Sequence, residues 1–151
     1  EENADSQEKG RLRGEISKFL LENTTFDIPA SQVDQETQSI IYDIVNQNTR
    51  RGVDKSEIEN SKEEIYQVAN QNAKDRVKMG YILDRIGQEE KFEAGAGEVN
   101  NYIRMMASRY GMQELDFRKA LEERDGIDEI KSEIEHAKTM DFLLEQAEIK
   151  R

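Results

Sequence analysis

The sequence predicts an all-α protein, and three observations support that fold class. Apolar residues recur at helical spacing along almost the whole chain of 151 residues. No alternation of apolar and polar residues is long enough to indicate a strand. Only 35% of the residues are apolar while 36% are charged, so a thick core is difficult to build. An elongated helical shape with thin packing fits this composition better than a globule.

The first two expected helices flank the chain's single proline. One face of the first helix carries apolar residues at helical spacing: Leu12, Ile16, Phe19 and Leu20. This helix ends near Asn23, and residues 24–29 form an extended connector because the residue before Pro29 disfavours the helical region. The second helix then runs to a terminator at Gly52. Its apolar stripe consists of Val33, Thr37, Ile40, Ile41, Ile44 and Val45.

The middle of the chain contains a charged stretch, and after it the sequence predicts one long helix. Within residues 54–64, Ser56 and Ser61 offer two alternative helix starts. The long helix is expected over residues 63–90, and its first apolar residues are Ile65, Val68, Ala69 and Ala73.

Residues 77–83 of this long helix are apolar nearly all round, which predicts burial between other helices. Gly80 and Gly87 each cost about 1 kcal/mol relative to alanine inside a helix. Their presence predicts either a closely approaching neighbour or a bend.

Three further helices are expected in the C-terminal part. After a break at residues 94–97, a fourth helix ends at Gly111. A fifth, over residues 113–124, has Gly126 as its terminator, and the last runs over residues 127–147. Their inner faces are expected to carry Val99, Ile103, Met106, Ala107 and Tyr110, then Phe117, Ala120 and Leu121, then Ile130, Ile134, Ala137 and Leu144.

Composition excludes several classes of function. The formal net charge of -11 argues against nucleic acid as a partner, because phosphate binding needs clustered Lys and Arg. The chain has no cysteine, which excludes disulfides and thiolate chemistry. No apolar run approaches the roughly 20 residues that span a bilayer, so we expect no membrane partner. The absence of cysteine is compatible with the cytoplasmic location that we expect. The first residue is Glu1 and not Met, which suggests a fragment of a longer protein or a processed chain.

No residue pattern marks a catalytic centre. Glu133 and His136 have the spacing of a ligand pair in di-iron helical bundles, but the chain has one histidine and cannot supply the second pair. Gly95 and Gly97 lack the third glycine and the preceding strand of a phosphate loop, so a flexible joint is the better interpretation. We therefore expect no catalytic residue, no metal and no cofactor.

A set of apolar side chains does not fit the core stripes and predicts a surface for binding extended polypeptide. Its members are Tyr42, Phe92, Met105, Met112, Phe142 and Leu143. Each one alone is an ordinary exposed apolar residue. Together they suit promiscuous binding, because methionine is flexible and polarizable.

Four segments of the chain form a pattern in their order and spacing. The first segment spans residues 23–36 and begins NTTFDIP, and the second spans 73–86 and reads AKDRVKMGYILDRI. The third spans 98–111 and ends MASRYG, and the fourth spans 138–147 and reads KTMDFLLEQA. In this order and spacing, the four segments resemble the C-terminal domain of trigger factor, the bacterial ribosome-associated chaperone, and the resemblance extends over residues 10–149.

The resemblance implies an elongated multi-helix domain with arm-like protrusions that shelters nascent polypeptide. Residues 1–151 would form a single helical chaperone domain that binds unfolded or nascent polypeptides without ATP. The family's ribosome-docking loop and isomerase domain are absent from this sequence. Ribosome contact would therefore require a missing domain, and proline isomerisation would belong to a longer parent.

Three alternatives stay open. A helical scaffold or dimerisation module for a dedicated partner, with a weak homodimer as one form, predicts one contiguous apolar patch. An enzyme would need a metal at Glu133 and His136. A periplasmic helical chaperone would show a signal peptide in its full-length sequence.

Overall fold

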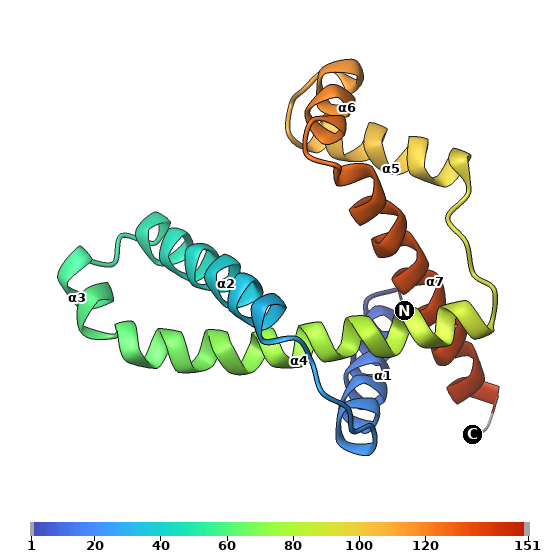
Figure 1. The fold of residues 1–151 in the computed structure, drawn as a ribbon, viewed down its shortest axis with the longest axis horizontal. Helices are drawn as coiled ribbons and strands as arrows, with labels where there is room; N and C mark the ends of the chain where they lie inside the picture. The colour runs from blue at the N-terminus through green and yellow to red at the C-terminus, as the bar shows by residue number, and fades with distance from the viewer. Residues whose placement is uncertain (1, 150–151) are drawn as a thin grey trace. The chain divides into compact units, whose positions relative to one another are not determined.

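The computed structural model describes residues 2–149, and these residues form seven helices and no strand, which confirms the all-α prediction. The helices are α1 (Glu2–Asn23), α2 (Ala30–Arg50), α3 (Lys55–Asn60), α4 (Lys62–Glu89), α5 (Ala96–Arg109), α6 (Glu114–Glu122) and α7 (Gly126–Ile149) (Figure 1). Among the described helices, none has the length and apolar character needed to cross a membrane.

The chain divides into two compact units, each with its own contacts. The α2–α4 unit is Ser17–Tyr81, and the α5–α7 unit combines Glu1–Ile16 with Ile82–Arg151. Helices α1 and α4 contribute residues to both units. The assignment of residues 1–151 to a single chaperone domain stays a prediction.

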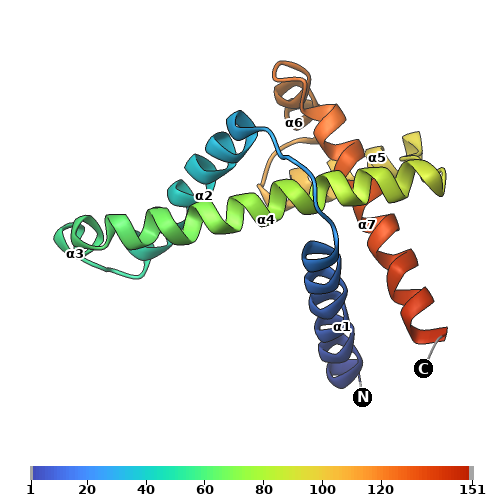
Figure 2. The ribbon, with the colours of Figure 1, turned by 60° about the horizontal axis from the view of Figure 1, so that its bottom comes forward.

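In the α2–α4 unit, α2 and α4 lie side by side and run in opposite directions, with α3 at the turn between them (Figures 1 and 2). The buried core between the two helices consists of Val33, Ile40, Ala69 and Ala73. The small alanines of α4 let α2 approach closely. Thr37 is buried in the same contact, where its hydroxyl donates to the Val33 carbonyl at 2.7 Å.

The connector between α1 and α2 is extended, as the proline predicts, and side chains tie it to α4. The ring of Phe26 packs edge to face on Tyr81 with centroids 6.1 Å apart. The Tyr81 hydroxyl donates to Gln32 at 2.9 Å, and the Lys78 ammonium donates to the carbonyl of Leu21 at 2.7 Å. These contacts fix the direction in which α2 begins.

In the α5–α7 unit, the last three helices contact one another pairwise (Figure 1). Their shared core consists of Val99, Ile103, Leu121 and Ile130. Ile103 has no exposed surface and lies on α5. The end of α4 also meets α7, because a Cβ added at Gly87 would lie 2.9 Å from Oγ1 of Thr139. Of the two alternatives predicted for Gly87, a close neighbour or a bend, this confirms the close neighbour.

Some side chains that we expected inside are exposed. Phe19 and Tyr110 are each 63% exposed and Val68 is 49% exposed. Ala120 and Ala137 are also exposed. Helical spacing determines which residues share a face, but the neighbouring helices determine how much of that face is covered.

Several helix boundaries differ from the expected ones. α1 begins at Glu2, well before the apolar face that starts at Leu12. Of the two alternative helix starts in the charged stretch, the one at Ser61 is confirmed, since α4 begins directly after it. The one at Ser56 is wrong, because α3 begins after Asp54 and Ser56 lies inside that helix. The expected break at residues 94–97 is shorter, because α5 already begins at Ala96.

Gly126 is not the terminator of α6 but the first residue of α7. Asp125, with φ of 55°, holds the left-handed position between the two helices instead. A Cβ at Gly126 would lie 2.9 Å from Cδ2 of Leu121. Glycine is therefore needed here for close approach to a buried leucine.

Candidate functional site

The turn that follows α2 brings the apolar residue Val53 back toward the end of that helix. The Gly52 N–H donates to the Thr49 carbonyl at 3.0 Å, and the Val53 N–H donates to the Asn48 carbonyl at 3.0 Å. These two bonds form a Schellman motif, which requires a left-handed residue in the position of Gly52, where φ is 79°. The motif fixes where Val53 lies.

Two more helices end in the same way. After α5, Gly111 has φ of 66° and the Met112 N–H donates to the Ala107 carbonyl at 2.9 Å. After α4, Lys91 takes the left-handed position with φ of 59°, and the Phe92 N–H donates to the Gly87 carbonyl at 2.9 Å. The apolar residues positioned by the three motifs are Val53, Phe92 and Met112.

Helices α5, α6 and α7 border a hollow with a volume of about 460 Å³, which we call the α5–α7 hollow. The apolar and aromatic part of its lining consists of Tyr102, Met106, Tyr110, Met112, Phe117, Ala120, Leu121 and Ile130. The rings of Tyr110 and Phe117 stack there with centroids 6.0 Å apart. Arg124, Glu129 and Glu133 add charge to the lining. The hollow therefore offers aromatic and thioether surface beside a charged border.

The Tyr102 hydroxyl donates a hydrogen bond to the Glu133 carboxylate in the lining of this hollow. This hydrogen bond, together with burial and the negative charge of Glu133, raises the pKa of Tyr102 to about 12. The phenol is thus a hydrogen-bond donor at neutral pH, and it orients the Glu133 carboxylate.

We expect Tyr102 to ionise near pH 12 rather than near the usual tyrosine pKa of about 10. Because the folded-state pKa is raised, its stabilising effect is complete below about pH 10 and is lost as the pH rises through about 12. Phenolate absorbance during a pH titration measures this step. Tyr102→Phe should remove the late step, and Tyr42→Phe should retain it. A late step that persists in Tyr102→Phe contradicts the assignment.

The Glu-x-x-His pattern does not form a ligand pair. Glu133 is engaged by Tyr102, whereas Nε2 of His136 lies 2.5 Å from Oδ1 of Asp84. Within the described part of the chain, no three His, Cys, Asp or Glu side chains gather closely enough to hold a metal ion. The two side chains have separate structural partners.

The glycine-containing stretch before α5 is a helix start. Gly95 precedes α5 directly, and its N–H donates to the Glu98 carboxylate at 2.8 Å. The ammonium of Lys138 on α7 donates to the same carboxylate at 2.6 Å. The Lys138 hydrogen bond and then the Gly95 hydrogen bond lower the pKa of Glu98. This carboxylate thus ties the start of α5 to α7.

A second hollow, of about 430 Å³, lies among α2, α3 and α4, and we call it the α2–α4 hollow. Its apolar lining consists of Ile41, Val45, Val53, Ile58 and Ile65. Thr49, Lys55, Glu59 and Lys62 complete it. Apolar periodicity does not predict this site, although the sequence contains one signal for it: Val53 directly follows the terminator Gly52.

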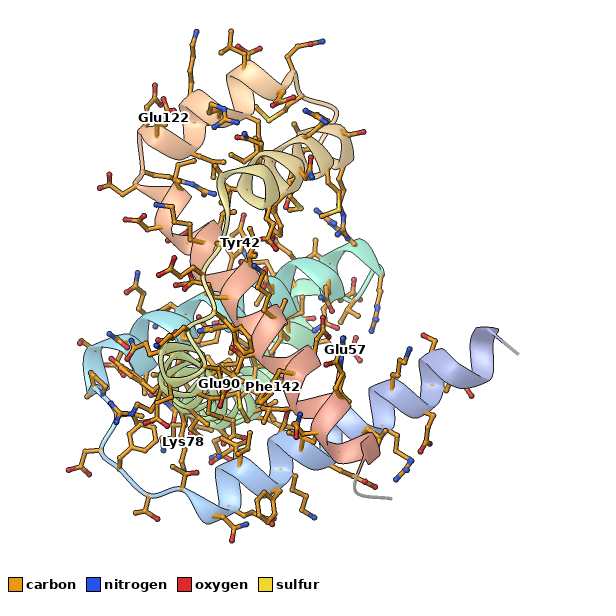
Figure 3. All side chains as sticks on the ribbon, turned by 90° about the vertical axis from the view of Figure 1, so that its right-hand side faces the viewer. Tyr42, Glu57, Lys78, Glu90, Glu122 and Phe142 are labelled. Atoms are coloured by element: carbon orange, nitrogen blue, oxygen red, sulfur yellow. The ribbon has the colours of Figure 1, made fainter. Side chains whose placement is uncertain are left out.

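The exposed members of the predicted binding set lie in both units. Met112 is 43% exposed and lines the α5–α7 hollow. Met105 is 57% exposed but is not part of that lining. Tyr42, on α2, is 69% exposed and does not line the α2–α4 hollow (Figure 3). Their role in binding stays a prediction.

The other three members are half-buried. The rings of Phe92 and Phe142 pack edge to face with centroids 5.5 Å apart. Figure 3 labels Phe142 on α7. Leu143, its neighbour on α7, is also half-buried. Phe92 and Phe142 thus hold each other within the α5–α7 unit, so less of their surface is free for a ligand.

These features define a class: an all-helical domain whose recognisable sites are apolar hollows beside helix ends. Residues 1–145 match the family described as "Bacterial trigger factor protein (TF) C-terminus". The chain therefore belongs to the trigger factor family of chaperones, which confirms the resemblance found in the four sequence segments.

Relatives named trigger factor match nearly the whole chain. The protein from Opitutus terrae is 29% identical over 146 residues, which are 96% of this chain and 33% of that protein. Those from Desulforudis audaxviator and Acetivibrio thermocellus are each 26% identical, covering 91% and 98% of this chain and 32% and 35% of their own lengths. The chain thus spans about a third of the length of these relatives.

A solved structure of trigger factor domains from Thermotoga maritima has a similar fold. Its TM-score is 0.62 at 18% sequence identity, and the match covers 91% of this chain and 81% of that one. The two chains therefore share a fold.

Proposed function

We propose that this chain is the client-binding module of a trigger factor chaperone, and that it holds apolar segments of unfolded or nascent polypeptides without using ATP. The observation that carries this proposal is the pair of hollows, of about 460 and 430 Å³, lined largely by apolar side chains. Surfaces of this kind accept segments of different sequence, because methionine and aromatic side chains adapt to irregular partners. Burial of apolar area drives such binding and needs no nucleotide.

The expected affinity is low for each contact. A client side chain that buries roughly 50 Å² of apolar area gains about 1 kcal/mol at about 25 cal/mol per Å². The cost of ordering the client offsets part of that gain. Several contacts must therefore act together, and each can release quickly, which suits a protein that shelters segments only until they fold.

The proposal concerns the part of trigger factor that this chain matches. Because the chain spans about a third of its relatives' length, we assign proline isomerisation and ribosome contact only to a longer parent, in other domains. A cytoplasmic location belongs to the same proposal.

We expect the purified chain to slow aggregation of a denatured client protein in the absence of nucleotide, as measured by light scattering. Val53→Asp should weaken this protection, because a carboxylate in the α2–α4 hollow would have to lose its water when a client binds. About fivefold more chain should then be needed for equal protection, which corresponds to about 1 kcal/mol.

Val68→Asp is the matched control, since Val68 is 49% exposed, lies in the same unit and does not line the hollow. It should protect the client as well as the unchanged chain does. Normal aggregation over a wide excess of the unchanged chain would refute the chaperone proposal. Equal loss in both variants would refute the assignment of the α2–α4 hollow.

A further inference from the structure

The five methionines, all within the described residues, differ in their access to solvent. Met105 and Met112 are 57% and 43% exposed, whereas Met79, Met106 and Met140 are partly buried. Met112 lines the α5–α7 hollow, and Met105 does not. Met112 is therefore the exposed methionine that lines the α5–α7 hollow.

The backbone holds Met112 at the hollow. Its N–H donates to the Ala107 carbonyl at 2.9 Å, and the N–H of Gly111 donates to the Ser108 carbonyl at 3.1 Å. The turn before Met112 is therefore closed by two hydrogen bonds, and the side chain starts from a fixed Cα. The stacked rings of Tyr110 and Phe117 line the same hollow. A chemical change at the Met112 sulfur therefore alters the hollow itself.

We propose that Met112 is a modification site at which a peroxide converts the thioether to a sulfoxide and thereby weakens apolar binding in the α5–α7 hollow. The proposal rests on the client-binding function proposed above. A sulfur lone pair attacks one oxygen of hydrogen peroxide, the S–O bond forms and the O–O bond breaks. The proton on the transferred oxygen passes to the departing hydroxide, giving water. Sulfur is oxidised by two electrons and the peroxide is reduced by two.

The sulfoxide changes what the hollow offers. The thioether is apolar and polarizable, whereas the sulfoxide oxygen is a strong hydrogen-bond acceptor that water solvates. A bound apolar segment would have to displace that water without replacing its hydrogen bonds, which is unfavourable. Oxidation of Met105 leaves the lining unchanged, since Met105 lies outside it.

The experiment treats the purified chain with limited hydrogen peroxide and locates added oxygen by peptide mass mapping. Binding of a fluorescent apolar peptide is then measured before and after treatment, with far-ultraviolet circular dichroism as a check on the fold. We expect Met105 and Met112 to be oxidised first and peptide affinity to fall about tenfold, or about 1.4 kcal/mol. The affinity of each variant after treatment is compared with its own affinity before treatment: it should be unchanged for Met112→Leu and should fall about tenfold for Met105→Leu, as it does for the unchanged chain. Untreated Met112→Gln, which places a polar group at the same position, should bind weakly.

Two results would overturn the proposal. One is an unchanged affinity when mapping shows Met112 fully oxidised, and the other is an equal loss of affinity in treated Met112→Leu. Binding by the untreated chain tests the proposed function separately, and a failure there refutes the function and the modification site that rests on it. Mapping reports the selectivity of oxidation without any client, so the two failures are distinguishable.

Discussion

Ile103→Ala should destabilise the α5–α7 unit by about 3 kcal/mol, within the range for truncating a buried isoleucine to alanine. Ile103 has no exposed surface, and its core partners are Val99, Leu121 and Ile130. Removing three carbons there leaves a cavity that these neighbours, held on three different helices, can fill only in part. Chemical denaturation gives the change in the free energy of unfolding, and amide hydrogen exchange in α5, α6 and α7 localises it.

Met105→Ala provides the matched control on the same helix. Met105 is 57% exposed, so its truncation should change the free energy of unfolding by less than about 0.5 kcal/mol. A cost for Ile103→Ala no greater than that of Met105→Ala would mean that α5, α6 and α7 do not share a packed core.

Gly87→Ala should also destabilise the α5–α7 unit, by about 2 kcal/mol, although alanine favours helices over glycine. The added Cβ would lie 2.9 Å from Oγ1 of Thr139, a contact too short to be tolerated without movement. Thr139 is fully buried, and its hydroxyl donates to the Glu135 carbonyl at 2.8 Å. Rotating the hydroxyl away would break that hydrogen bond, so the two helices must separate instead. Thermal and chemical denaturation measure the effect.

Two further variants test whether the contact between the added Cβ and Thr139 causes this destabilisation. In a Thr139→Ala background the obstructing oxygen is gone, so adding Gly87→Ala should cost much less than it does alone. Gly14→Ala in α1 should stabilise the chain by up to about 1 kcal/mol, because nothing lies within 4 Å of the added Cβ. Stabilisation by both glycine substitutions would show that α7 does not approach α4 closely.

The two large hollows share a construction that suits a binding surface. Each lies where a helix ends in a Schellman motif followed by an apolar residue, Val53 in one and Met112 in the other. Where a helix ends, the chain changes direction, and the side chains of the adjacent helix beyond that point are no longer covered by it. The returning apolar side chain therefore remains partly open to solvent, and the rigid turn holds it in place.

The candidate site was predictable in part. The sequence predicts Met112 as a binding residue because it does not fit an apolar stripe, and the structure puts it in the α5–α7 hollow. The same criterion predicts Phe92 and Phe142, yet they pack on each other. The apolar stripe on α2 predicts that Ile41 and Val45 are core residues. Ile41 does pack against the core, but both side chains also line the α2–α4 hollow. Spacing along one helix cannot distinguish these outcomes, because burial depends on side chains that come from other helices.

The sequence by itself determined the helices and most of their limits, since apolar periodicity, the single proline and the left-handed glycines Gly52 and Gly111 act over a few residues. It also determined the family, through four ordered segments. The tertiary structure alone decided which apolar residues stay exposed, why α7 begins at Gly126, and where the two hollows lie. The physical reason is that these features depend on contacts between residues far apart in the chain, where the volume and position of a neighbouring side chain decide what a local pattern cannot.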